Sequence, residues 1–170
     1  HDNTAIIWDT TTGAVERTLT GENGHTGFIW AVSFSFNGEY VITGGQDNVA
    51  KIWNANTGKV IFTLDNCHDY YAGAILSVAV SPVGNIVATG TEDFTVKLYG
   101  ISTGQAIKTL SGSTSREKMK SIRVGGIGGG VSRGAKAVEF SADGDFLLVG
   151  NSIEFTSKLY HVNSGSHVLT

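Results

Sequence analysis

Four units of similar sequence recur along this chain, and their period constrains the fold more than any other feature. Each unit carries an aromatic residue that is followed five positions later by glycine. These aromatic residues are Trp8, Trp53, Tyr99 and Tyr160, at spacings of 45, 46 and 61 residues. An acidic residue precedes each aromatic residue by six positions, at Asp2, Asp47, Asp93 and Glu154. Such periods are typical of arrays in which one supersecondary unit stacks on the next.

Within each unit the side chains follow the pattern of short strands. The alternating runs 31–34 and 77–80 predict first strands, each followed by a four-residue turn that ends in glycine. Second, third and fourth strands are predicted after them, for example at 40–43, 49–53 and 59–64. Twenty-three glycines against one proline also favour many short strands joined by tight turns. The chain is therefore predicted to be all-β.

Four antiparallel strands per unit predict the blades of a β-propeller, because one twisted sheet cannot bury both of its faces alone. We divide the chain into the third and fourth strands of one blade, two blades, a basic glycine-rich insertion and a further blade, at residues 1–24, 25–66, 67–111, 112–134 and 135–170. About three and a half blades are thus expected. Closed propellers have about four to eight, and we interpret the chain as a fragment of a larger propeller protein.

The residues of these units resemble the WD-repeat family, whose signature combines Gly-His with Trp-Asp. The matching pairs are Gly24-His25 and Trp8-Asp9. Departures from the signature occur at Trp53-Asn54, Cys67-His68, Tyr99-Gly100 and Tyr160-His161. The resemblance covers nearly the whole chain outside residues 112–134. It implies a propeller that docks proteins or peptides within multi-subunit assemblies.

Polar side chains at fixed places in the units allow two interpretations. Thr43, His25 and Asp47 could act as nucleophile, base and orienting acid. The family resemblance implies instead a buried hydrogen-bond network, formed by His25, Thr43, Asp47 and Trp53 in one unit and by His68, Thr89, Asp93 and Tyr99 in the next. Such a network lowers the cost of burying polar groups and ties a loop to a sheet. We favour the structural interpretation and predict no catalytic residue.

Other features exclude further classes of site. Cys67 is the single cysteine and cannot form an internal disulfide, which favours an intracellular location, cytoplasmic or nuclear. Cys67 and His68 lack the second pair of ligands that a zinc site needs, so no metal is predicted. The glycine run 125–130 lacks the Gly-Lys-Ser/Thr ending of a phosphate loop, so no cofactor is predicted. No apolar run approaches the ~20 residues of a membrane span.

The insertion at residues 112–134 concentrates positive charge. Its basic residues are Arg116, Lys118, Lys120, Arg123 and Arg133, and its net charge is +4 where the remaining chain carries -7. Loops after second and fourth strands leave an antiparallel blade at the same end. The insertion is therefore predicted to share an end with the turns that hold Asp47 and Asp93. Long loops on a rigid scaffold often carry function.

We expect the insertion to contact an acidic protein surface or a phosphate-bearing partner. A solvated spacer is the alternative. Nucleic acid is disfavoured, because the insertion contains no aromatic residue that could stack on bases and the rest of the chain is acidic.

The predicted function is a non-catalytic scaffold or adaptor that docks protein or peptide partners as a subunit of a larger complex. Aromatic residues in predicted loops and turns are further candidate contacts, namely Phe28, Trp30, Tyr70, Tyr71 and Phe94. For each of them, packing between blades is the alternative. One alternative is a propeller that positions substrate for a catalytic domain outside this sequence. Another is a sensor of phosphate groups or nucleic acid that uses the insertion.

Overall fold

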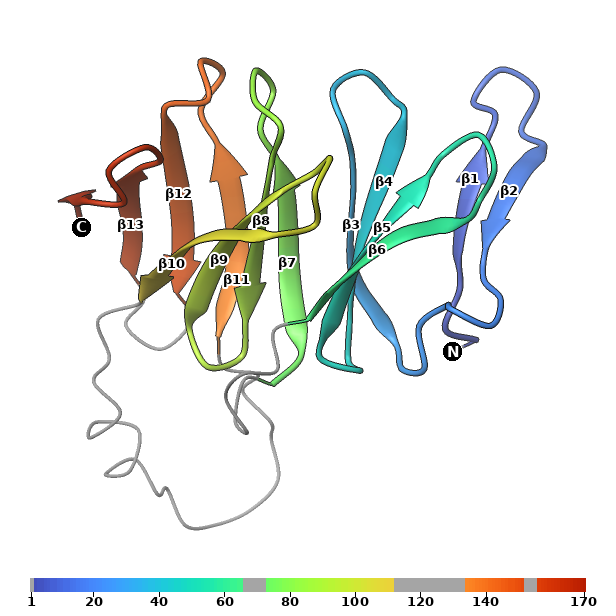
Figure 1. Ribbon diagram of the computed structural model, residues 1–170, viewed down its shortest axis with the longest axis horizontal. Helices are drawn as coiled ribbons and strands as arrows, with labels where there is room; N and C mark the ends of the chain where they lie inside the picture. The colour runs from blue at the N-terminus through green and yellow to red at the C-terminus, as the bar shows by residue number, and fades with distance from the viewer. Residues whose placement is uncertain (1, 66–72, 112–133, 152–155) are drawn as a thin grey trace, which may run out of the picture.

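The computed structural model describes residues 2–65, 73–111, 134–151 and 156–170. These residues form short strands and no helix (Figure 1). The first two sheets contain β1 (Ala5–Trp8) and β2 (Val15–Leu19), then β3 (Ile29–Phe34), β4 (Tyr40–Gly45), β5 (Val49–Asn54) and β6 (Val60–Asp65). The next two contain β7 (Ile75–Val80), β8 (Ile86–Thr91), β9 (Thr95–Gly100), β10 (Ala106–Ser111), β11 (Ala135–Phe140), β12 (Phe146–Asn151), β13 (Thr156–His161) and β14 (His167–Leu169).

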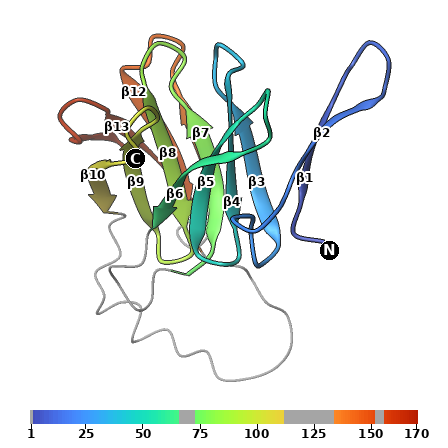
Figure 2. The ribbon, with the colours of Figure 1, turned by 45° about the vertical axis from the view of Figure 1, so that its right-hand side comes forward.

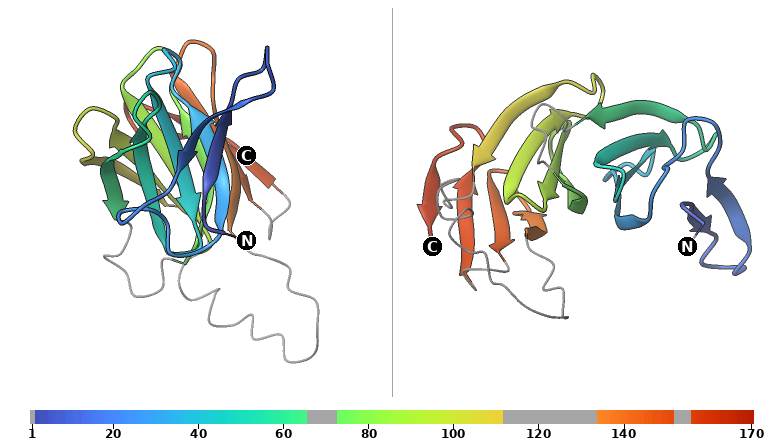
Figure 3. Two further views of the ribbon diagram at one scale, coloured as in Figure 1. Left: turned by 90° about the vertical axis from the view of Figure 1, so that its right-hand side faces the viewer. Right: turned by 90° about the horizontal axis from the view of Figure 1, so that it is seen from below.

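Every sheet is antiparallel, and its strands lie side by side in the order of the sequence. One sheet has two strands, β1-β2, and the other three have four strands each, β3 to β6, β7 to β10 and β11 to β14. The all-β prediction and the count of about three and a half blades are therefore confirmed. Figure 3 shows the sheets following one another in an arc, with β1 and β2 at one end and β13 near the other. The described strands do not close this arc into a ring.

The first strands begin two residues earlier than the alternating pattern predicted. The pairing of β3 with β4 shifts between Ile29 and Ala31, and the pairing of β7 with β8 shifts between Ile75 and Ser77. An irregularity of this kind interrupts the two-residue alternation of side chains. The sequence pattern therefore identified only the regular part of each strand.

The hydrophobic core lies between successive blades, whose sheets face one another (Figure 2). Leu19 of the two-stranded sheet is buried with Val41 and Trp53 of the next blade. Two larger clusters fill the next two interfaces, one around Ile42, Ile75 and Val87, the other around Ala88, Val138 and Leu147. Because these apolar side chains are buried between neighbouring sheets, the sheets must stack to form a core.

A repeated contact joins the outer strand of each blade to a turn of the following blade. The Arg17 guanidinium Nε donates a hydrogen bond of 2.7 Å to the Asn56 carbonyl oxygen. Lys108, at the same place in its strand, donates from Nζ to the carbonyl oxygens of Val162 and Asn163. Phe62 holds this place in the intervening blade and packs on Gly104. We call this contact of Arg17, Phe62 and Lys108 the outer latch; the sequence analysis did not find it.

The ends of the outer strands lie beside two turns that the sequence analysis singled out. Asp65 pairs with Val49, just after the turn that holds Asp47. Ser111 pairs with Thr95, just after the turn that holds Asp93. The strand ends that precede residues 66–72 and 112–133 are therefore at the same end of the blades as these turns.

Candidate functional site

A chain of hydrogen bonds joins four side chains inside the blade of β3 to β6. The Trp53 indole Nε1 lies 2.8 Å from the Thr43 hydroxyl oxygen, which lies 2.6 Å from Nε2 of His25. Nδ1 of His25 is 2.9 Å from both carboxylate oxygens of Asp47. The backbone N–H of Thr26 also donates to Asp47. The loop before β3, the centre of β4 and β5, and the turn between them are thereby connected.

The chemistry of the donors fixes the direction of these bonds. An indole nitrogen can only donate and a carboxylate can only accept, so the Thr43 oxygen accepts from Trp53 and Nδ1 of His25 donates to Asp47. In the neutral form of His25, Nε2 then carries no proton and accepts from the Thr43 hydroxyl. Burial lowers the pKa of His25 below its ordinary value of 6.5, and this effect exceeds the opposite effect of Asp47.

This arrangement leaves little scope for acid–base chemistry on a substrate. Thr43 is fully buried and His25 is 7% exposed. The hydroxyl hydrogen of Thr43 already belongs to a bond within the protein, so the oxygen has no open approach to an external carbonyl or phosphoryl group. The geometry supports a role in holding the blade together.

The next blade carries related residues in a different arrangement. Thr89 is fully buried at the place of Thr43, but its hydroxyl oxygen has no hydrogen-bond partner among the described residues. Asp93 accepts from the Thr91 hydroxyl and from the backbone N–H of Thr95 instead of reaching Thr89. Tyr99 is buried, and His68 lies outside the described residues. Thr89 and Asp93 are therefore not bonded to each other, and the part of the predicted set that involves His68 stays a prediction.

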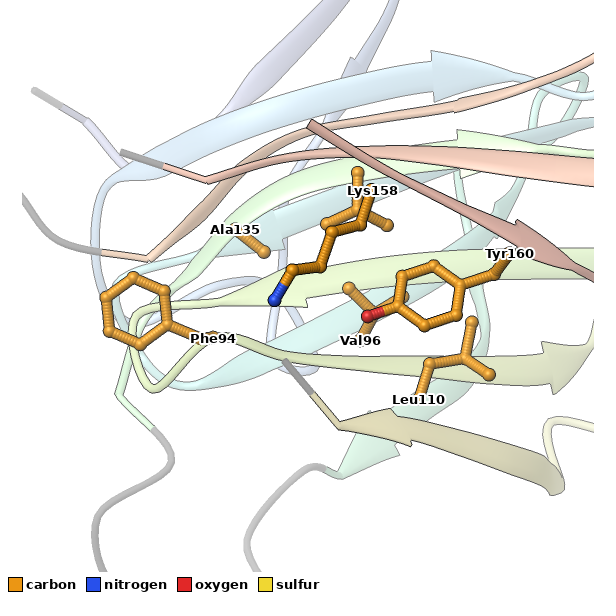
Figure 4. A pocket seen from close by; sticks show the side chains of 7 residues that line it. Phe94, Val96, Leu110, Ala135, Lys158 and Tyr160 are labelled. Atoms are coloured by element: carbon orange, nitrogen blue, oxygen red, sulfur yellow. The ribbon is translucent and has the colours of Figure 1, made fainter. Parts of the chain in front are cut away.

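In the last blade the place of Thr43 is taken by Val149, and a small cavity of about 10 Å³ remains at the interface with the preceding blade. Figure 4 shows the Lys158 amine and the Tyr160 hydroxyl turned toward this cavity. Phe94 and Val96 line its other side. A space of this size holds about one water molecule. The sequence analysis did not identify Lys158, although a lysine recurs at this place in β5, β9 and β13.

The predicted contact residues divide into exposed, buried and undescribed groups. Trp30 is 55% exposed and lies edge-on against Phe28, with ring centroids 6.1 Å apart. Of the two interpretations for Phe94, the structure supports packing between blades: its side chain is 3% exposed and lies at the interface between two blades. Outside the described residues lie Tyr70, Tyr71, Arg116, Lys118, Lys120, Arg123 and Arg133.

Two further observations concern metal ions and membranes. Among the described residues, no group of three or more His, Cys, Asp or Glu side chains is placed to hold a metal ion. Within the same part of the chain, no helix is long and apolar enough to cross a membrane.

The stacked four-stranded antiparallel sheets define this chain as a repeat-built β-propeller protein. Residues 14–54 and 58–100 match the family described as WD domain, G-beta repeat. These matches include the complete network of His25, Thr43, Asp47 and Trp53. The chain belongs to the WD-repeat family.

Curated relatives match parts of the chain. Eukaryotic translation initiation factor 3 subunit I of Scheffersomyces stipitis is 40% identical over 65 residues, which are 38% of this chain and 18% of that protein. Protein tipD of Dictyostelium discoideum is 35% identical over 72 residues, 41% of this chain and 11% of that protein. Angio-associated migratory cell protein of Homo sapiens is 38% identical over 61 residues, 36% and 14% respectively. The matches thus span less than a fifth of these relatives.

Proposed function

We propose that this chain is a non-catalytic, intracellular scaffold that docks protein or peptide partners within a multi-subunit assembly. The observation that carries the proposal is the bonding of His25, Thr43, Asp47 and Trp53 to one another inside a blade. The side chains that resembled a catalytic set are used to fix the scaffold. Similarity to a protein named as a subunit of a translation initiation factor also supports a place within an assembly.

The end of the blades near Asp47 and Asp93 is the proposed docking end. The chain enters and leaves residues 112–133 from strands that end there, as the pairing of Ser111 with Thr95 indicates. The five basic residues of the insertion give this part of the sequence a charge opposite to that of the remaining chain. A partner with an acidic or phosphate-bearing surface would be attracted to it.

The proposal can be tested by affinity capture and mass spectrometry with two forms of the chain, one intact and one with residues 112–134 replaced by a short turn. Captured proteins are then purified and titrated against the chain at low and high salt. We expect particular partners to be lost with the insertion and to bind the intact chain less tightly as salt rises.

A second pair of variants tests the charge itself. In one variant the five basic residues of the insertion are replaced by glutamine. In the control, two exposed residues outside the insertion are replaced by glutamine: Lys59, directly before β6, and Lys136, in β11. Loss of binding in the first variant alone supports the proposal. Partners that bind all variants equally, at all salt concentrations, would show that the insertion is a spacer.

A further inference from the structure

The turns between first and second strands carry the two most exposed large apolar side chains of the described residues. Phe36, in the β3–β4 turn, is 84% exposed, and Val83, in the β7–β8 turn, is 69% exposed. In an antiparallel blade these turns lie at the opposite end from the turns between second and third strands. Together with the β11–β12 turn they therefore project away from the end that holds Asp47 and Asp93 (Figure 1).

These three hairpin turns are neighbours. Strand β3 packs against β7, and β7 packs against β11, so the turns that follow these strands lie side by side (Figure 2). A Cβ atom on Gly144, in the β11–β12 turn, would lie 2.4 Å from Cγ2 of Val83, so Val83 rests against the next turn. Phe36 and Val83 are therefore parts of one surface. Exposed apolar groups that gather on one surface are typical of interaction sites.

Hydrogen bonds fix the backbone of the hairpin turns. In the β3–β4 turn the Gly38 N–H donates to the Ser35 carbonyl oxygen and the Tyr40 N–H donates to the Ser35 hydroxyl, both at 2.9 Å. Ser141 accepts the same two bonds in the β11–β12 turn. A surface whose backbone is already ordered loses little conformational freedom when a partner binds.

The hairpin turns are also acidic. From its serine to the residue after its glycine, none of the three contains lysine or arginine. Their acidic residues, all exposed, are Glu39, Asp143 and Asp145. The Ser141 hydroxyl and the Asp145 N–H donate to the Asp143 carboxylate and lower its pKa below the ordinary value of 3.8. Asp143 is therefore fully charged at neutral pH.

The adjoining turns between third and fourth strands, at residues 54–59, 100–105 and 161–166, add little positive charge. Each is hydrogen-bonded to a hairpin turn, through the N–H groups of Ala55, Ile101 and Val162. They contain one lysine, Lys59, one histidine, His161, and no arginine. The carboxylates thus outnumber the cations at this end of the blades.

We propose that the hairpin turns form a second docking surface, which binds a protein segment that combines large apolar side chains with lysine or arginine. This hairpin surface consists of Phe36, Val83, Glu39, Asp143 and Asp145. The apolar side chains of the partner pack on the phenylalanine and the valine, and its cations pair with the three carboxylates. A phosphate-bearing partner is repelled here. Strand β10 ends at the opposite end of the blades, so a partner of the insertion and a partner of the hairpin surface can bind at the same time.

A fluorescently labelled synthetic peptide in which lysine and leucine alternate provides the probe. Fluorescence anisotropy measures its binding to the unmodified chain, and we expect saturable binding that weakens as salt rises. Peptides with glutamine in place of lysine, or with serine in place of leucine, should bind about tenfold less tightly, because each lacks one of the two kinds of contact.

Two variants of the chain locate the binding. Phe36→Ser should weaken binding about tenfold, because a phenylalanine side chain that becomes buried contributes enough to change the affinity by that factor. Asp143→Asn should weaken binding at low salt and reduce its dependence on salt. Asn37 holds the place of Asp143 in the β3–β4 turn and accepts from the Ser35 hydroxyl as Asp143 accepts from Ser141, so this substitution preserves the turn.

The matched control carries Ile107→Ser and Glu16→Gln, at exposed residues of β10 and β2 outside the hairpin surface. It should bind the peptide as the unmodified chain does. Absence of saturable binding, unchanged affinity in Phe36→Ser or an equal loss in the control would overturn the proposal. Self-association of the unmodified chain in analytical ultracentrifugation that is lost in Phe36→Ser would instead assign the surface to a second copy. Every form keeps residues 112–134, so these readouts are independent of the proposed docking end.

Discussion

Thr43 shows how the same residue type contributes differently in two blades. Its hydroxyl accepts from Trp53 and donates to His25, so its removal leaves both partners unsatisfied. Thr89 holds the same place in the next blade and is equally buried, but its hydroxyl has no partner among the described residues. The contribution of a buried hydroxyl thus depends on the bonds it makes.

We predict that Thr43→Val lowers the free energy of unfolding by about 1–3 kcal/mol, the usual cost of leaving a buried polar partner unsatisfied. Thr89→Val is the matched control. It should change the free energy of unfolding little, or raise it, because valine has nearly the same shape and replaces a hydroxyl that has no partner among the described residues. Urea denaturation of both variants provides the measurement. Equal losses in the two variants would contradict the assignment of the network.

His25 gives the stability of the chain a pH dependence with a defined sign. Burial lowers the pKa of His25 in the folded chain below 6.5. As the pH falls below about 6.5, the unfolded chain takes up a proton at this residue before the folded chain does, so the free energy of unfolding decreases. The free energy of unfolding stops decreasing at the pH at which His25 is protonated in the folded chain as well. The contribution of neutral His25 is fully present above pH 6.5.

Denaturation curves between pH 8 and pH 5 test this prediction when the chain is compared with His25→Gln, which has no titrating group at this place. We expect the variant to be less stable at pH 8 and to lose less stability on acidification. Parallel pH profiles would show that His25 does not titrate differently in the folded and unfolded chains.

At the scale of the element, the outer latch makes a turn of one blade depend on the outer strand of the preceding blade. Gly104 has a φ of 66°, and a Cβ atom there would lie 2.7 Å from the Phe62 ring. Gly13 occupies the same turn position in the first sheet with a φ of 69°, and nothing lies within 4 Å of its Cβ position. Substitutions at the two glycines therefore differ in crowding but not in backbone strain, so comparing them separates the two costs.

Gly13→Ala should destabilise the chain by about 1–2 kcal/mol, the cost of a left-handed conformation for a residue with a side chain. Gly104→Ala should lose about 1–3 kcal/mol more, because its methyl group also displaces Phe62. Thermal unfolding of the two variants measures the difference. Equal losses would mean that Phe62 moves aside freely and that the latch contributes nothing.

The periodic spacing predicted the strands, because these depend on local alternation, and the resemblance to the WD-repeat family predicted the members of the first network. It could not predict the earlier start of β3, since a shift in pairing interrupts the alternation. It placed Phe94 in an exposed turn, whereas the neighbouring blade buries it. The outer latch escaped notice for a related reason: Arg17, Phe62 and Lys108 differ chemically and share only their position.

At the scale of the whole molecule, the core consists of interfaces between successive blades, so each sheet depends mainly on its neighbours. This explains why the outer latch and the buried clusters recur along the arc with different residues.

The central claim is that the chain docks a partner at the end of the blades that holds the turns of Asp47 and Asp93. Hydrogen–deuterium exchange with mass spectrometry tests it most directly, by comparing the chain alone with the chain bound to a partner purified after capture. The account predicts slower exchange on binding in residues 112–134 and in the turns at 45–49 and 91–95, with no change in the buried strand β5. Slower exchange confined to the outer strands, with residues 112–134 unaffected, would contradict it.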